Sequence, residues 1–167
     1  MGEIVTLEAL QEKRKGLAAA GKRVVFTNGY FDLLHVGHTR YLQQAKALGD
    51  VLIVAVNVDA TARQSKDSRR PIIPQDERAE VVAALSCVDY VVLFEGETAV
   101  ALVSLLRPDI YVKGGDYGAE GGVPLPEAAA VEAYGGQVVI LPYQGGHSTT
   151  GVVETIIQRY SPPSGVL

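Results

Sequence analysis

Six consecutive apolar residues, VLIVAV at positions 51–56, constrain the fold of this chain more than any other feature. A strand without a polar face must be covered on both sides, which is typical of the parallel sheets of α/β proteins. Four further segments predict strands, at residues 23–27, 90–94, 110–112 and 138–141. Helical patterns lie between and after them, at residues 36–48, 75–85, 98–106, 125–134 and 152–160. The alternation predicts a Rossmann-like, doubly wound α/β fold, with a mainly parallel five-stranded sheet and helices on both faces.

The length of 167 residues suits a single domain, residues 1–167, that buries its own core. Within it, residues 1–21 are predicted to hold an N-terminal helix with Thr6 as its cap. Residues 161–167 contain two prolines and are predicted to form a flexible tail.

Charge and hydropathy exclude several classes of protein. A formal net charge of −4 argues against a general nucleic-acid-binding protein, which usually carries a basic excess. No apolar run approaches the roughly 18 residues of a membrane span, and no signal-peptide pattern opens the chain. We therefore expect a cytoplasmic protein that binds neither nucleic acid nor membrane. The single cysteine, Cys87, lies in an apolar run and is expected to be a buried small residue.

A phosphate site is predicted where the first strand leads, through residues 28–38 (NGYFDLLHVGH), into the following helix. The free N–H groups of a helix N-terminus attract phosphate. His35 and His38 lie on one face of the first turn and can carry positive charge that a neighbouring phosphate would favour. Gly37 leaves room for close approach to the backbone. The alternative is that the histidines only cap the helix, or that one of them lies in the core.

Polar residues also follow the other predicted strands, at the carboxyl ends where open α/β sheets bind ligands. Asn57 and Asp59 follow the second strand, residues 113–116 (KGGD) the fourth, and residues 147–150 (HSTT) the fifth. Residues 148–150 are interpreted as a second phosphate site at a helix N-terminus, or as a simple cap. Lys113 is interpreted as a phosphate or substrate ligand, or as a solvated lysine. This placement at strand ends is the main argument from the residues for a functional site.

A basic cluster and three carboxylates are the remaining candidate site residues. Lys66, Arg69 and Arg70 form either a mobile arm that closes over phosphates or a solvated charged face. The carboxylates Asp32, Asp59 and Asp116 need ribose hydroxyls, a magnesium ion or a basic partner in a site for anions. No nucleophilic elbow and no H-E-x-x-H zinc motif occurs. The chemistry that remains is phosphoryl or nucleotidyl transfer by positioning, in which a phosphate of the substrate attacks.

The motif at residues 28–38, followed by STT at 148–150, resembles the nucleotidylyltransferase superfamily of the cytidylyltransferase type. The match extends over roughly residues 20–160, through the segments AKALGD (45–50), VNVD (56–59), RP (70–71), ER (77–78), VDYV (88–91) and VKGGDY (112–117). VKGGDY with YGG (134–136) and STT looks most like the ADP-heptose synthase branch. Since no sugar-kinase domain is present, the stand-alone form of that adenylyltransferase is expected.

The resemblance implies that the phosphate of D-glycero-β-D-manno-heptose 1-phosphate attacks the α-phosphorus of ATP, with Mg²⁺ balancing charge, to give ADP-heptose and pyrophosphate. It implies catalytic roles for His35, His38 and the loop lysine Lys66. It implies nucleotide contacts for Asn28, Gly29, Tyr30, Phe31, Gly37, Lys113, Gly115, Asp116, Tyr117, Ser148, Thr149 and Thr150. It implies contacts to the second substrate, or to groups near it, for Asp32, Asn57, Asp59, Arg70 and Arg78. No protein metal ligand is assigned, and a homodimer is expected from relatives.

Two positions depart from the family pattern, and two other functions remain open. Tyr30 stands where many relatives carry Thr or Cys, so that only a backbone N–H contact is expected there. His147 stands where cytidylyltransferase relatives often carry an apolar residue; we favour an exposed loop residue over a phosphate donor. One alternative function is a CTP-dependent cytidylyltransferase acting on glycerol 3-phosphate or a similar small phosphate. The other is a nucleotide-binding domain without turnover.

Overall fold

The structure, a computed structural model, describes residues 1–65, 69–115, 117, 123–142 and 147–161. Two of the residues predicted to act in the site, Lys66 and Asp116, lie outside the described residues, as does nearly all of the predicted tail. Within the described ranges, no helix has the length and apolar character needed to cross a lipid bilayer.

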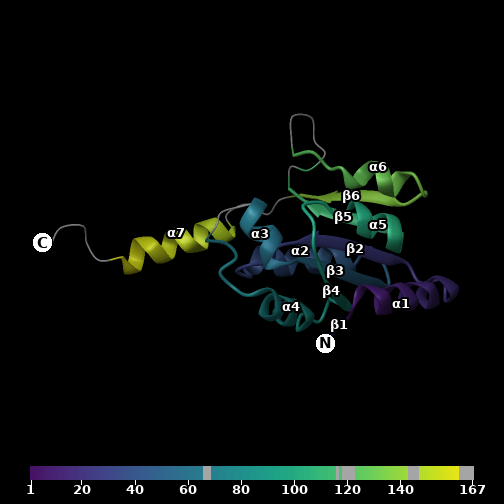
Figure 1. Cartoon of the computed structure of the whole chain (residues 1–167), viewed down its shortest axis with the longest axis horizontal. Helices are drawn as coiled ribbons and strands as arrows, with labels where there is room; N and C mark the ends of the chain where they lie inside the picture. The colour runs from purple at the N-terminus through teal and green to yellow at the C-terminus, as the bar shows by residue number, and fades with distance from the viewer. Residues whose placement is uncertain (66–68, 116, 118–122, 143–146, 162–167) are drawn as a thin grey trace, which may run out of the picture.

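One parallel sheet forms the centre of the molecule, with the strand order β1-β4-β3-β2-β5-β6 (Figure 1). The strands are β1 (Glu3–Ile4), β2 (Val24–Gly29), β3 (Val51–Asn57), β4 (Tyr90–Phe94), β5 (Ile110–Gly114) and β6 (Gln137–Leu141). The helices are α1 (Leu7–Ala19), α2 (Val36–Lys46), α3 (Asp59–Ser65), α4 (Gln75–Ala83), α5 (Val100–Leu106), α6 (Glu127–Glu132) and α7 (Thr149–Tyr160). The predicted α/β class with a parallel sheet is confirmed.

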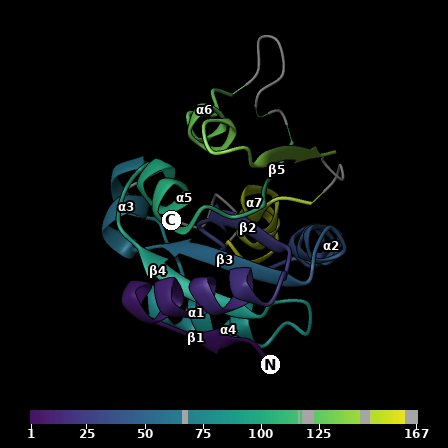
Figure 2. The same ribbon diagram turned by 90° about the vertical axis from the view of Figure 1, so that its right-hand side faces the viewer.

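Helices cover both faces of the sheet, as the apolar run in β3 requires (Figures 1 and 2). In β3, Ile53 and Ala55 belong to a core cluster that includes apolar side chains of α1, α5 and α6. The alternate residues Leu52, Val54 and Val56 belong to a second cluster that includes side chains of α2 and α4. All seven residues of β3 are buried, so the strand is the middle layer between two cores. Helix α7 has no buried residue and projects away from these layers (Figure 1).

The predicted number of five strands is wrong by one, and one helix was missed. The two-residue strand β1 pairs with β4 through Glu3 and Ile4, and two residues are too few to show a strand pattern in the sequence. Helix α3 falls in a segment that reads as polar in the sequence, and its residues 59–64 include just two buried ones, Thr61 and Ala62. The cap of α1 is confirmed, since the Ala9 backbone N–H donates to the Thr6 hydroxyl at 3.2 Å.

The direction of the chain across the sheet reverses at β2. From β2 the chain moves outward through β3 to β4, and then returns to add β5 and β6 on the other side of β2. The loops that follow β2 and β5 therefore leave in opposite directions from adjacent strands, and a crevice forms beyond their carboxyl ends. The fold thus places the residues after β2 and β5 at the point where such sheets bind ligands.

We expect Leu42→Ala to lower the free energy of unfolding by about 2–5 kcal/mol, because the fully buried Leu42 anchors α2 in the second core cluster. The measurement is chemical denaturation. The control is Leu105→Ala on α5, whose side chain is 48% exposed and for which we expect a change within about 0.5 kcal/mol. Equal losses for the two variants would contradict the burial of the apolar face of α2.

Candidate active site

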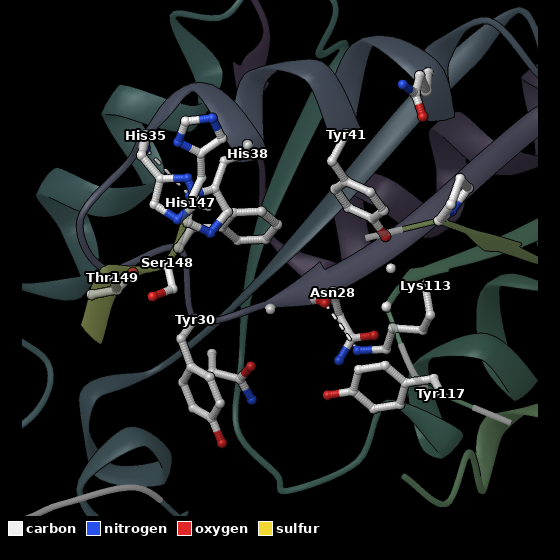
Figure 3. A pocket seen from close by; sticks show the side chains of 18 of the residues that line it. Asn28, Tyr30, His35, His38, Tyr41, Lys113, Tyr117, His147, Ser148 and Thr149 are labelled. Atoms are coloured by element: carbon white, nitrogen blue, oxygen red, sulfur yellow. Dashed lines mark hydrogen bonds between the residues drawn. The ribbon is translucent and has the colours of Figure 1, made fainter. Parts of the chain in front are cut away.

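A cavity of about 880 Å³ lies beyond the carboxyl ends of β2 and β5 (Figure 3). Thirteen of the residues predicted for the site line it: Asn28, Gly29, Tyr30, Phe31, His35, Gly37, His38, Asn57, Lys113, Gly115, Tyr117, Ser148 and Thr149. They come from segments that are up to about 120 residues apart in the chain. The crossover at β2 therefore gathers most of the predicted residues around one space.

The β2–α2 loop carries the two histidines on the first turn of α2. His35 is the N-cap, and its backbone N–H donates to Nδ1 of His38 at 3.4 Å. The two ring centroids are 4.0 Å apart, and the Phe31 ring lies 5.6 Å from that of His38. Phe31 has a φ of 48°, in the left-handed region, and its side chain is 5% exposed. The capping interpretation therefore holds for His38, and the same two rings also line the cavity.

The imidazoles of this pair are held neutral in the ligand-free protein. Burial lowers the pKa of His38 to about 4, with a further contribution from His35. Burial, and then the charge of His147, lower the pKa of His35. The positive charge expected on these imidazoles near pH 7 is therefore absent, and a neighbouring anion would be needed to offset the cost of burying that charge. Since Nδ1 of His38 accepts a hydrogen bond, the neutral ring carries its proton on Nε2 and can still donate it.

One polar atom of the pair lacks a partner. Nδ1 of His35 is buried and has no hydrogen bond among the described residues. Leaving a buried polar atom unsatisfied costs roughly 1–3 kcal/mol. Such an atom in the wall of a cavity indicates a site that is completed by a ligand or by water.

The N-terminus of α7 forms another part of the cavity wall. The Ser148 hydroxyl caps the helix by accepting from the Gly151 backbone N–H at 3.0 Å. The Thr149 hydroxyl donates to the Leu33 carbonyl at 3.4 Å, so that this helix joins the β2–α2 loop. Thr150 is exposed and does not line the cavity, so its contact with a nucleotide stays a prediction.

Lys113, at the end of β5, is buried rather than solvated, with 9% of its surface exposed. Its ammonium donates to the Asn28 carbonyl at 3.1 Å and lies 5.0 Å from the centre of the Tyr117 ring. The Asn28 side chain accepts from the Tyr111 hydroxyl at 2.7 Å. A buried ammonium that lines the cavity supplies positive charge in a low dielectric, where its attraction for an anion is strong.

Four of the predicted substrate contacts instead hold the loops that shape the cavity. The Arg78 guanidinium, 1% exposed, donates to the Asn57 carbonyl at 2.8 Å and to Asp59 at 2.7 Å. It also donates to the backbone carbonyl of Tyr30. None of Asp32, Asp59, Arg70 and Arg78 lines the cavity. The basic partners that were one expectation for Asp32 and Asp59 are thus present, and contact of these four residues with the second substrate stays a prediction.

Asp32, like Arg78, connects two loops near the cavity. Its carboxylate pairs with Arg70 at 2.9 Å and accepts from the backbone N–H groups of Ile72 and Ile73 at 2.8 and 3.0 Å. Because these three partners belong to the 70–73 segment, Asp32 ties that segment to the β2–α2 loop. Asn57 does line the cavity, while its side-chain amide donates to the Gly96 carbonyl at 2.9 Å.

Several lining residues were missed in the sequence. Tyr41 and Gln44 follow His38 by three and six positions, so the helical period could have found them. Glu97 and Thr98 follow β4, so the rule of polar strand ends could have found them. His147 was expected to be exposed, and this is wrong, because it is half-buried and lines the cavity.

Neither a metal site nor a reactive thiol is formed by the described residues. They contain no group of three His, Cys, Asp or Glu side chains that could hold a metal ion. Glu97 is the one acidic side chain among the described residues that line the cavity, so these side chains do not form a magnesium site of their own. Cys87 is half-buried and does not line the cavity, and burial raises the pKa of its thiol.

We expect Arg78→Ala to lower the free energy of unfolding by about 3–5 kcal/mol, because it leaves the Asp59 carboxylate and buried carbonyls without their donor. Arg63→Ala is a matched control, since Arg63 pairs with the same carboxylate at 3.7 Å but its side chain is 57% exposed. We expect a change of under about 1 kcal/mol for the control. Denaturant melts measure both, and similar losses would contradict the role of Arg78.

A second prediction concerns acid sensitivity. His38 stays neutral in the folded protein down to about pH 4, whereas the unfolded chain takes up this proton near pH 6.5. The unfolded state therefore binds more protons in that window, and the free energy of unfolding should fall as the pH is lowered through it. His38→Gln should make this fall less steep in denaturant melts between pH 7 and pH 4.5. The same pH dependence in both proteins would contradict the assignment.

Comparison with known proteins places this geometry in a family. The model of the family described as cytidylyltransferase-like matches residues 26–130. The bifunctional protein HldE of Trichlorobacter lovleyi is 48% identical over 159 residues, which are 95% of this chain and 32% of that protein. HldE of Geobacter sulfurreducens is 51% identical over 142 residues, 85% of this chain and 28% of that protein. The chain thus spans about a third of the length of the curated relatives it matches.

Solved structures agree in fold. The lipopolysaccharide core biosynthesis protein from Thermoplasma volcanium is 31% identical, with a TM-score of 0.60 over 76% of this chain and 100% of that one. Pantoate-beta-alanine ligase from Francisella tularensis shares the fold alone. It is 15% identical, and the match, with a TM-score of 0.59, covers 90% of this chain and 70% of that one. With the family motif on two helix N-termini around one cavity, the chain belongs to the cytidylyltransferase-like family.

Proposed function

We propose that this chain transfers AMP from ATP to D-glycero-β-D-manno-heptose 1-phosphate, releasing pyrophosphate and ADP-heptose. The observation that carries nucleotidyl transfer is the pair of helix N-termini, those of α2 and α7, that meet at one cavity with His35, His38 and Thr149 in its wall. The choice of ATP and of a heptose phosphate is supported by the family resemblance and by relatives of about 50% identity.

In the proposed reaction, an oxygen of the acceptor phosphate attacks the α-phosphorus of the nucleotide. The bond from that phosphorus to the oxygen bridging to the β-phosphate breaks, and pyrophosphate leaves with the electron pair. No side chain has to act as a nucleophile, so catalysis consists of holding the two phosphates in line and stabilising the charge on the transferring and departing oxygens.

The residues of the cavity suit these tasks. His38 offers an Nε2 proton, and His35 lies beside it with a ring separation of 4.0 Å, so both can donate to phosphate oxygens where charge develops. The N-terminus of α7, with the Thr149 hydroxyl, suits the β- and γ-phosphates. The buried ammonium of Lys113 adds a positive charge in the same cavity.

The test is a pyrophosphate-release assay that crosses ATP and CTP with heptose 1-phosphate, other sugar phosphates and glycerol 3-phosphate. We expect release with ATP only when the heptose 1-phosphate is present. Release with CTP and glycerol 3-phosphate would replace the proposal by a cytidylyltransferase. Nucleotide binding without release for any acceptor would indicate a binding domain. Sedimentation of the same protein tests the homodimer that belongs to this proposal.

We expect His38→Ala to lower kcat by roughly a hundredfold or more, because it removes a donor that acts where charge develops in the transition state. Thr39→Ala is the matched control, because Thr39 is the next residue of α2 and does not line the cavity. It should keep kcat within about a factor of three, a loss well below one catalytic donor. Robust turnover by His38→Ala would rule out the catalytic assignment.

A further inference from the structure

We propose that His147 is a third phosphate-contacting imidazole beside His35 and His38, and that it makes the affinity for a triphosphate chain increase as the pH falls. The inference rests on the proposed function only in placing a triphosphate in this cavity. It concerns a residue for which the family resemblance provides no role.

The first observation is the position of the His147 ring. His147 directly precedes Ser148, the N-cap of α7, and lines the cavity with it. Its ring is roughly parallel to that of His35, with centroids 6.3 Å apart and an interplanar angle of 30°. Figure 3 shows the rings of His35, His38 and His147 gathered close to Ser148 and Thr149. An imidazole at this place lies where the two helix N-termini meet.

The second observation is that the backbone makes room for this arrangement. A Cβ at position 37 would lie 2.9 Å from the ring of His35 and 3.2 Å from Cβ of His147. Both distances are shorter than ordinary van der Waals contact, so any side chain at Gly37 would push the two histidines apart. The glycine of the motif therefore lets His147, just before α7, lie close to His35.

The third observation concerns charge. The other titratable groups among the described lining residues are Glu97, Lys113 and the tyrosines Tyr30, Tyr41 and Tyr117. Burial and neighbouring imidazoles disfavour an added proton on His35 and on His38. A bound triphosphate reverses this balance, because its oxygens accept from protonated imidazoles and offset their repulsion. Binding then takes up protons, and the affinity increases as they become available.

The fourth observation is the unsatisfied Nδ1 of His35. It is buried next to the proposed contact and has no partner among the described residues. A phosphate bound between His35 and His147 would offer it an acceptor once the ring is protonated. This supports an anion site in this cavity that includes Nδ1 of His35.

The experiment uses calorimetry with inorganic tripolyphosphate, which has the phosphate chain but no base, from pH 8 to pH 6. The variants are His147→Phe, which keeps a ring against His35 but has no ring nitrogen, and His147→Gln, which keeps a donor but cannot titrate in this range. From pH 8 to pH 6, we expect the Kd of the wild-type protein to decrease by about three- to tenfold more than the Kd of either variant. The reason is that each variant lacks up to one proton that the wild type takes up on binding. At pH 6 we expect His147→Phe to bind most weakly.

Two outcomes would overturn the inference. One is the same pH dependence in wild type and both variants, and the other is no binding of tripolyphosphate by the wild-type protein. Circular dichroism shows whether each variant is folded, and two different replacements keep one misfolded variant from deciding the result. A failed pyrophosphate-release assay with retained tripolyphosphate binding would reject the proposed reaction while leaving this inference standing.

Discussion

The site depends on one buried guanidinium. Arg78 of α4 donates to backbone carbonyls of the loop after β2, of β3 and of the 70–73 segment, and it also pairs with Asp59 at the start of α3. A side chain that is 1% exposed cannot exchange these partners for water, so removing it takes the closer basic partner from the partly buried Asp59 carboxylate and leaves the buried Asn57 carbonyl without this donor. The Asp32–Arg70 pair ties the 70–73 segment to the β2–α2 loop from the other side. The charged side chains that the sequence suggested as substrate contacts are thus paired with each other and with backbone groups, and these pairs hold the loops that shape the cavity.

With the loops held in this way, the groups that line the cavity are arranged to attract an anion. Burial lowers the pKa of His35 and of His38, so these two imidazoles are neutral near pH 7. The buried Lys113 and the two helix N-termini supply a fixed positive potential, and Nδ1 of His35 has no hydrogen-bond partner within the described ranges. Donors arranged before the ligand arrives need little reorganisation during the reaction, and this is how positioning alone can accelerate phosphoryl chemistry.

The sequence predicted the α/β class and the region of the site for the same physical reason. The apolar run of β3 has no polar face, so it requires a parallel sheet covered on both sides, and parallel strands present their carboxyl ends at one edge. Polar residues after β2, β5 and β6 were therefore expected to meet, and most of those described do line one cavity. The short strand β1 and the helix α3 were missed. Neither two residues nor a mostly polar segment shows a hydrophobic period that distinguishes it from a loop.

The sequence by itself determined the layered architecture, the strand ends that carry the candidate site and the two helix N-termini that meet there, because hydrophobic period and motif spacing are local properties of the chain. Only the tertiary structure decided which polar residues face the cavity. Arg78, Asp59 and Asp32 turn toward buried partners from distant loops, while His147 turns inward against His35. The pairing of a charge depends on which segments the strand crossovers bring within about 3 Å of it, and no local pattern in the sequence contains that information.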